Sequence, residues 1–126
     1  LRNNIEFTGP LERIGMAQEL EKCDLYLLPS LIENSPNTLV EAMTVGVPIV
    51  AAAAGGIPSM IRDEQEGLLY RPEDYQMAAF QISRLLKDQE FASRLGKSAQ
   101  IRAFKRHDNR EILDNMILTY GTVLND

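Results

Sequence analysis

The sequence predicts an α/β fold, in which a parallel sheet of about four strands has flanking helices and is followed by a helical C-terminal region. The first reason is an alternation of helical patterns with short apolar runs at residues 5–8, 24–28, 47–52 and 67–70. The second is that these runs are nearly continuous, as in strands buried on both faces of a parallel sheet. The third is that only helical periodicity remains in residues 74–126, the expected helical tail of a single domain spanning residues 1–126.

The first predicted unit is a strand followed by a helix. Residues 5–8 (IEFT) form the strand, which Gly9-Pro10 turns, and residues 11–23 form the helix. One face of this helix is apolar and consists of Leu11, Ile14, Ala17 and Leu20. We interpret Cys23 as a buried residue at the helix end rather than a reactive thiol, because neither histidine nor metal-ligand spacing accompanies it.

The second unit begins with the buried strand at residues 24–28 (DLYLL), which Pro29 ends. A loop at residues 30–34 follows and contains Glu33. A helix is expected next. Its start is either Ser35 as the N-cap with Pro36 at the first helical position, or Asn37 as the cap.

This helix contains Glu41 and ends at Gly46, which is predicted to be a C-terminal cap. The strand at residues 47–52 (VPIVAA) follows it. Gly55-Gly56 then forms a turn in which the backbone can adopt a positive φ or approach a ligand closely.

The rest of the chain holds one short strand and several helices. A helical turn at residues 57–61, with Pro58 as its first residue, precedes the strand at residues 67–70. Asp74 is the predicted cap of a helix that ends at Lys87.

Two further helices are expected, at residues 89–105 and from Asp108 onward. Helical spacing predicts the inward-facing residues of the three helices to be Met77, Ala78, Phe80, Gln81, Leu85, Leu86, Leu95, Ala99, Ile101, Phe104, Ile112, Leu113, Met116, Ile117, Tyr120 and Val123. We interpret the basic cluster of Arg102, Lys105, Arg106 and Arg110 as a solvated face, and His107 as a capping or surface residue.

Composition excludes several classes of protein. The chain has 44% hydrophobic and 25% charged residues, which is typical of a globular domain. Its net charge of −5 argues against a nucleic-acid-binding surface. It contains no apolar stretch of about 18 residues. A single cysteine fits a reducing, cytoplasmic location, and no metal or cofactor is expected.

The helix that begins near Asn37 is the candidate ligand site. Its N-terminus follows the carboxyl end of a parallel strand, where open α/β sheets bind their ligands. The first amides of this helix, at Asn37, Thr38 and Leu39, favour an anion such as phosphate. A carboxylate beside a phosphate is unfavourable unless it accepts hydrogen bonds, for example from sugar hydroxyls, and Glu33 and Glu41 flank this N-terminus.

The segment PSLIENSPNTLVEAMTVGVPIVAAAAGGIPSMI resembles the nucleotide-sugar-binding segment of retaining glycosyltransferases of family four, which have the GT-B fold. The matched positions are Pro-Ser, Glu, seven residues, Glu-Ala-Met, Gly, Pro-Ile-Val-Ala and Gly-Gly-Ile-Pro. IEFTGPL before this segment and EGLLYRPED after it extend the resemblance over residues 5–74. The fold that this implies is part of the Rossmann-like C-terminal domain of a GT-B enzyme.

The resemblance implies a nucleotide diphosphate sugar as donor and a role for each motif residue. Glu41 would accept hydrogen bonds from the ribose hydroxyls, and Glu33, the catalytic candidate, would contact the donor sugar near the reacting carbon. The backbone of Asn34, Ser35, Asn37, Thr38 and Leu39 would hold the sugar and the distal phosphate. The loop that contains Gly9 and Pro10 and ends at Arg13 would border the base. Asn34-Ser35 stands where many members of the family have Gly-Phe, which leaves the identity of the sugar open.

The resemblance also implies that the chain is an N-terminally truncated piece of a longer enzyme. In the strand order 3-2-1-4-5-6, two strands that precede residue 5 would lie between the strand at residues 5–8 and that at residues 24–28. The first strand therefore pairs directly with the second, or it is displaced, swapped or exposed. An exposed sheet edge recruits other chains, so self-association through that edge is expected.

Two classes of function remain open. The first is the donor-binding part of a retaining glycosyltransferase, inactive by itself, whose acceptor is a glycan or a lipid-linked molecule and whose parent enzyme is cytoplasmic and peripheral to the membrane. The second is a non-catalytic module that binds a nucleotide or a protein on the same scaffold. Sugar-nucleotide epimerases fit the Glu-Ala-Met, Gly, Pro pattern less well.

Overall fold

The computed structural model describes residues 2–124, and the side chains of residues 3–122. At its centre is a sheet of three parallel strands in the order β1-β2-β3, formed by β1 (Tyr26–Leu28), β2 (Ile49–Ala52) and β3 (Leu68–Tyr70). In the register of this sheet Tyr26 lies beside Ile49, and Val50 lies beside Leu68. All of β2 is buried, which explains its uninterrupted apolar sequence.

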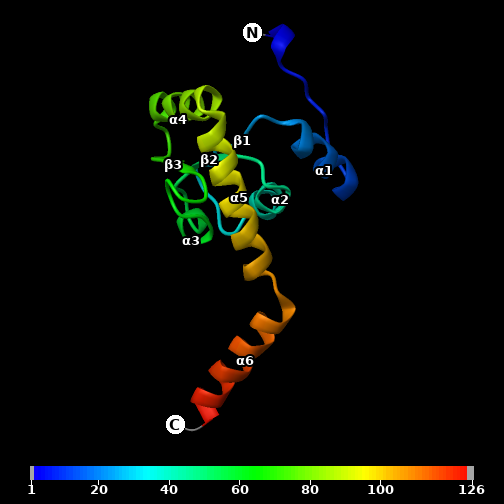
Figure 1. Ribbon diagram of the computed structural model, residues 1–126, viewed down its shortest axis with the longest axis vertical. Helices are drawn as coiled ribbons and strands as arrows, with labels where there is room; N and C mark the ends of the chain where they lie inside the picture. The colour runs from blue at the N-terminus through cyan, green and yellow to red at the C-terminus, as the bar shows by residue number, and fades with distance from the viewer. Residues whose placement is uncertain (1, 125–126) are drawn as a thin grey trace.

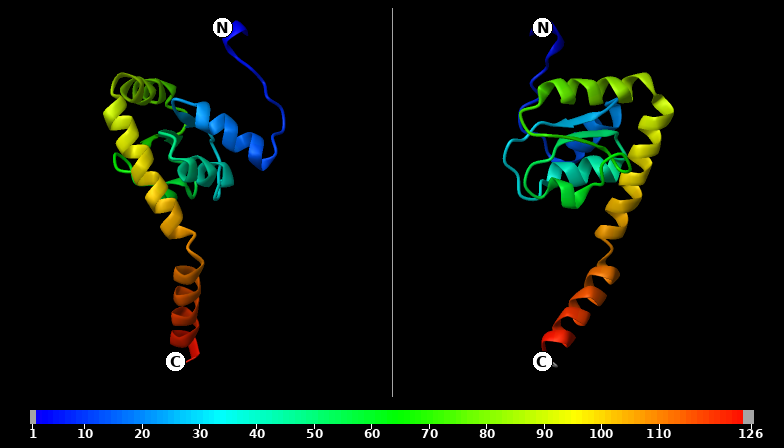
Figure 2. Two further views of the ribbon diagram at one scale, coloured as in Figure 1. Left: turned by 45° about the vertical axis from the view of Figure 1, so that its right-hand side comes forward. Right: turned by 90° about the vertical axis from the view of Figure 1, so that its left-hand side faces the viewer.

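Helices cover both faces of the sheet (Figures 1 and 2). The helix α4 (Tyr75–Lys87) covers one face, and α2 (Asn37–Val45) and the short α3 (Ile57–Met60) cover the other. The long α5 (Gln89–Arg106) runs beside the sheet and packs closely on α2. The helix α1 (Arg13–Lys22) packs on α2, α6 (Asn109–Leu124) points away from the body, and a 3₁₀ turn spans Arg2–Asn4.

The strand predicted at residues 5–8 does not form, so the sheet described has three strands instead of about four. Residues 5–8 are an exposed segment without secondary structure, in which 55% of the surface of Ile5 and 92% of that of Phe7 face solvent. A strand needs a partner for its amides and carbonyls, and within residues 2–124 this segment has no neighbouring strand to pair with. Of the two predicted alternatives, direct pairing with β1 is therefore wrong.

Several predicted caps are confirmed. The Asp74 carboxylate accepts from the Met77 amide at 2.9 Å, and Gly46 ends α2 in the left-handed conformation with φ 88°. The Asp108 carboxylate, just before α6, accepts from the Arg110 amide at 2.8 Å and from the Glu111 amide at 3.3 Å. Pro58 is the second residue of α3 rather than the first, because Ile57 opens that helix.

The predicted inward-facing positions hold only where a helix has a neighbour. Ala78, Gln81, Leu85, Leu95 and Ala99 are buried as expected. The predictions fail on the outer faces of α4 and α5 and along α6, where the exposed residues are Met77, Phe80, Leu86, Ile101, Phe104, Ile112, Leu113, Met116, Ile117 and Tyr120. Among the described residues α6 contacts the rest of the chain only near its start, so its periodicity does not bury it. The side chain of Val123 lies outside those that the structure describes.

Cys23 is also exposed instead of buried, and its Sγ donates to the Glu19 carbonyl at 3.1 Å. It follows α1, which buries Leu20 against α2 and leaves its other faces open. Over residues 2–124 we find no helix that is both long and apolar enough to cross a lipid bilayer.

Candidate donor-binding site

The loop that contains Glu33 connects the carboxyl end of β1 to α2. Glu33 is half-buried, and one of its carboxylate oxygens accepts a hydrogen bond from the Ser30 hydroxyl at 2.9 Å. Leu31 and Ile32 on the same loop are exposed. The Ser30 contact orients the carboxylate at the edge of the sheet where α/β proteins bind their ligands.

The glycine pair Gly55-Gly56 packs directly against the backbone of this loop. Gly55 has φ 51°, and a Cβ built on it would lie 1.6 Å from the Glu33 carbonyl oxygen. A Cβ on Gly56 would lie 1.9 Å from the Asn34 carbonyl oxygen. The predicted positive φ in this turn is therefore confirmed at Gly55, and the group that the glycine backbone approaches closely is the loop of residues 33–34.

The start of α2 differs by one residue from both predicted alternatives. Pro36 is the N-cap, buried and extended, and Asn37 is the first helical residue. Ser35 does not cap the helix, because its hydroxyl donates to the sulfur of Met60 at 3.7 Å. Proline has no side-chain acceptor, so the first amides of α2 are left without a cap.

The amides of this first turn are not equivalent. The Leu39 amide donates to the Pro36 carbonyl at 3.2 Å, which removes it from the predicted anion-binding set. Within the described part of the chain the amides of Asn37 and Thr38 have no acceptor. These two remain available to an anion.

Glu41 lies one turn into α2, half-buried, at a cavity of about 460 Å³ between α1 and α2. The residues that line this cavity are Arg13, Met16, Ala17, Leu20, Asn37, Val40, Glu41, Thr44, Val45 and His107. Asn37 and Glu41 therefore open onto one space, at the spacing of one helical turn. His107 ends α5, as predicted, and borders the same cavity.

Tyr26 is a site residue that the sequence did not indicate. Burial raises the pKa of its hydroxyl, the carboxylates of Glu33 and Glu41 raise that pKa further, and a hydrogen bond with the Thr38 side chain opposes them. Tyr26 is half-buried in β1 and packs against the core cluster that contains Leu39 and Met43 of α2. The available signal was that Tyr26 bears the only hydroxyl in the apolar run at residues 24–28.

The predicted base-binding residues stand apart from the glutamates. Gly9 and Pro10 lie in the exposed segment before α1, and a Cβ on Gly9 would meet no heavy atom within 4 Å. Only Arg13, at the start of α1, reaches the cavity that contains Glu41. In the described residues the structure does not bring Gly9 or Pro10 to the other predicted site residues.

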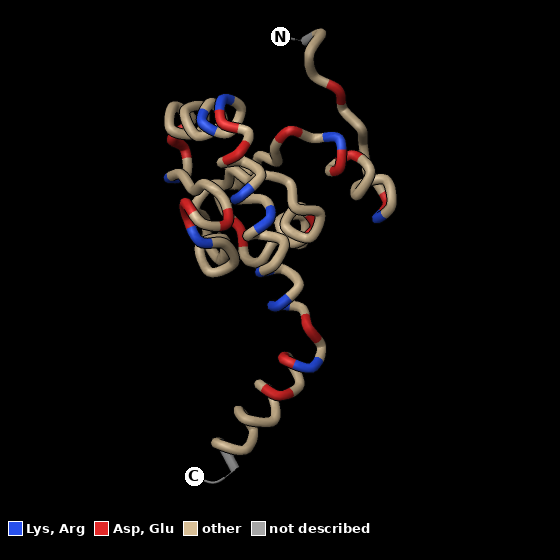
Figure 3. The backbone as a smooth tube through the Cα atoms, in the orientation of Figure 1, with Lys and Arg blue, Asp and Glu red and all other residues tan. Residues whose placement is uncertain are grey.

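Acidic and basic residues are interspersed along the chain, as Figure 3 shows. No group of three or more His, Cys, Asp or Glu residues is arranged to hold a metal ion within the range described.

Comparison with known proteins identifies the family. The family described as glycosyl transferases group 1 matches residues 1–102. The chain belongs to this family. A sulfoquinovosyl transferase of Arabidopsis thaliana is 37% identical over 97 residues, which are 75% of this chain and 19% of the plant protein. N-acetyl-alpha-D-glucosaminyl L-malate synthase of Bacillus anthracis is 31% identical over 126 residues, which are 100% of this chain and 32% of the bacterial protein.

Solved structures agree with this placement. HepE of Anabaena in complex with UDP-glucose superposes with a TM-score of 0.76 at 30% identity, covering 87% of this chain and 30% of HepE. The C-terminal domain of the group 1 protein LpcC from Francisella tularensis shares the fold, with a TM-score of 0.71 at 21% identity over 83% of this chain and 53% of that domain. The predicted fold class is confirmed: the chain corresponds to part of the C-terminal, donor-binding domain of a GT-B glycosyltransferase, and spans a fifth to a third of its curated relatives.

Proposed function

We propose that this chain binds the nucleotide diphosphate of a sugar donor for a retaining glycosyltransferase. The observation that carries the proposal is the arrangement around the start of α2, where two uncapped amides lie between the oriented carboxylate of Glu33 and the cavity that contains Glu41. Helix amides favour phosphate, and carboxylates accept hydrogen bonds from sugar hydroxyls. The UDP-glucose bound in HepE supports this choice of ligand class.

Each residue has a role in this proposal. Glu41 accepts hydrogen bonds from the ribose hydroxyls, and Glu33 contacts the donor sugar next to the reacting carbon. The backbone of Asn34, Ser35, Asn37 and Thr38 holds the sugar and the distal phosphate. The Leu39 amide takes no part, because it already donates a hydrogen bond to the Pro36 carbonyl.

The reaction proposed for the whole enzyme is transfer with retention of configuration, by attack of the acceptor on the same face from which the diphosphate leaves. The helix dipole and basic residues stabilise the leaving diphosphate. The acceptor is a glycan or a lipid-linked molecule in the cytoplasm. We propose that other parts of the whole enzyme bind the acceptor and neutralise the diphosphate. The chain alone would then bind the donor weakly, in about the millimolar range, and would not transfer the sugar.

The ribose role of Glu41 is tested by titrating the chain with UDP and with 2′,3′-dideoxy-UDP, followed by NMR. The wild type should prefer UDP, and Glu41→Ala should remove that preference and weaken UDP binding roughly thirtyfold, because hydrogen bonds to a charged group are worth about 2 kcal/mol.

The control for this titration is Glu90→Ala, which removes an exposed carboxylate from the first turn of α5. It should bind both nucleotides like the wild type. A Glu41→Ala chain that still distinguishes UDP from its dideoxy form would contradict the ribose role, and a wild-type chain that binds neither nucleotide would contradict donor binding.

We also propose that the chain associates with a second copy of itself through the outer edge of β1. This is the edge at which the predicted strand at residues 5–8 is missing, and among the described residues β1 pairs only with β2. A largely apolar groove of about 320 Å³ lies between α4 and the sheet, and Leu27 of β1 is one of the residues that line it. Unpaired strand edges of this kind recruit other strands.

Light scattering as a function of concentration tests the association. We expect dimers at high concentration, and we expect Leu27→Lys to restore the monomer, because a charge on an edge strand opposes pairing. Exposed Leu118→Lys, on α6, serves as the control and should leave the dimer intact. A wild-type chain that stays monomeric at all concentrations would rule out this interface.

A further inference from the structure

Arg102 of α5 holds the end of the short helix α3. Its Nε donates to the Met60 carbonyl at 2.7 Å, and one terminal nitrogen donates to the Ser59 carbonyl at 3.1 Å. Arg106, one turn further along α5, donates to the Ser59 carbonyl at 3.3 Å. The last carbonyls of a helix lack partners within the helix, so these guanidinium groups replace them. The interpretation of this cluster as a solvated face is therefore wrong for Arg102.

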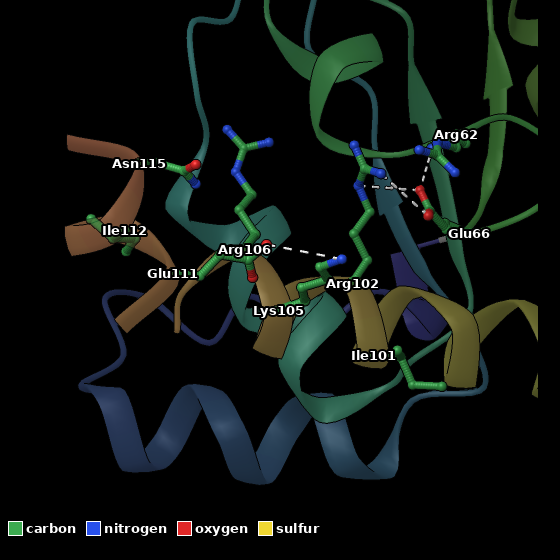
Figure 4. A pocket seen from close by; sticks show the side chains of 9 residues that line it. All are labelled: Arg62, Glu66, Ile101, Arg102, Lys105, Arg106, Glu111, Ile112 and Asn115. Atoms are coloured by element: carbon green, nitrogen blue, oxygen red, sulfur yellow. Dashed lines mark hydrogen bonds and ion pairs between the residues drawn. The ribbon is translucent and has the colours of Figure 1, made fainter. Parts of the chain in front are cut away.

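Glu66 fixes the guanidinium of Arg102 in this position, as Figure 4 shows. One carboxylate oxygen lies 3.3 Å from Arg102 Nε and also accepts from the Arg62 amide at 2.7 Å. Only 8% of the surface of Glu66 is exposed. A carboxylate this buried needs its paired cation, so the geometry of Arg102 is tightly determined.

Both ends of α3 contact the loop that contains Glu33. The Ser35 hydroxyl donates to the Met60 sulfur, and Gly56, the N-cap of α3, lies directly beneath the Asn34 carbonyl. Gly55 lies beneath the Glu33 carbonyl in the same way. A displacement of α3 therefore moves the backbone on which Glu33 is placed.

We propose that Arg102 is a positioning residue of the donor site. It fixes the position of α3. In turn, α3 and the glycine pair fix the backbone position of the loop of residues 30–35, and with it the position of the Glu33 carboxylate. Arg102 touches none of the proposed donor-binding residues and acts only through α3. The consequence for the sugar rests on the proposed function, whereas the positioning of the loop does not.

The test compares ¹⁵N NMR spectra of the ligand-free chain as the wild type, Arg102→Lys and Arg102→Gln. Lysine keeps a charge beside Glu66, but its single nitrogen cannot reach both carbonyls of α3 and the carboxylate together. We expect both variants to shift the amide signals of residues 33–35. The lysine variant keeps the test decisive if glutamine, which leaves Glu66 unpaired, unfolds the chain.

Arg94→Lys and Arg94→Gln are the matched controls on the same helix. The guanidinium of Arg94 lies over the Phe91 ring, 5.1 Å from its centre, so these changes should shift signals near Phe91 and leave residues 33–35 unmoved. If a folded Arg102→Lys chain gives the same signals at residues 33–35 as the wild type, Arg102 does not position the loop.

Titration with UDP-glucose and with UDP adds the functional readout. Glu33 is assigned to the sugar alone, whereas residues 34 and 35 share the distal phosphate with the first amides of α2. Arg102→Lys should therefore weaken UDP-glucose binding about two- to thirtyfold, the range for residues coupled to a site by packing, and weaken UDP binding by a smaller factor. An equal loss for both ligands would indicate a general structural role and overturn the proposal. If the wild type binds neither ligand, the proposed function fails, while the spectra of the ligand-free chain still decide whether Arg102 positions the loop.

Discussion

Replacing Gly55 by alanine should lower the free energy of unfolding by about 3 kcal/mol and disrupt the proposed donor site. Roughly 1–2 kcal/mol comes from placing a side chain at φ 51°, and about 1–3 kcal/mol from the overlap with the Glu33 carbonyl. The neighbour that must move is backbone, so the strain is relieved only if the loop of residues 30–35 shifts. Urea unfolding measures the first effect, and the NMR signals of residues 33–35 measure the second.

Gly9→Ala is the matched control for this substitution. Gly9 also has a positive φ, of 67°, but its Cβ would meet no atom within 4 Å. The variant should lose only the roughly 1–2 kcal/mol that the positive φ costs, and it should leave the signals of residues 33–35 in place. If the two alanine variants are equally stable, the close approach between Gly55 and the Glu33 carbonyl does not exist in solution.

Gly96→Ala should destabilise the domain by roughly 2–4 kcal/mol, although alanine is the better helix former. Gly96 is buried in the middle of α5, and its Cβ would lie 2.2 Å from the Gly46 carbonyl oxygen at the end of α2. The clash with backbone forces the two helices apart. This costs more than the roughly 0.5–1 kcal/mol that alanine gains from its higher helix propensity. Thermal or urea unfolding gives the difference directly.

The same substitution on α6 should have the opposite sign. A Cβ on Gly121 would meet nothing within 4 Å, so Gly121→Ala should leave stability unchanged or raise it by up to about 1 kcal/mol. A stable Gly96→Ala protein would mean that α5 does not cross α2 as closely as the structure shows. Because α2 contains Glu41, the crossing also affects the position of a residue of the proposed donor site.

Local signals in the sequence were sufficient for the elements with local causes. Asp74 and Gly46 cap their helices as predicted, since a cap depends on a side chain or a φ value within a few residues. The three strands that form were likewise predicted, because each is an apolar run bounded by turn residues. The family resemblance was confirmed because the glutamates, the prolines and the glycine pair have an ordered spacing along the chain.

Predictions that depended on a partner elsewhere failed where the partner was absent. Residues 5–8 have the composition of a strand but no neighbouring strand among the described residues. Met116 and Ile117 have helical spacing, but α6 has nothing to cover them in the described part of the chain. Periodicity shows which face of an element is apolar, and it does not show whether that face is covered.

By itself, the sequence determined the fold class, the family and the positions of Glu33 and Glu41 around the start of α2. Only the tertiary structure showed that Gly55 and Gly56 lie against the carbonyls of the loop, and that Asn37 and Glu41 open onto a cavity shared with α1. It alone showed that Arg102, far along the chain, holds α3 beneath this loop. Local signals act over a few residues, whereas these contacts exist only after segments distant in sequence have packed together.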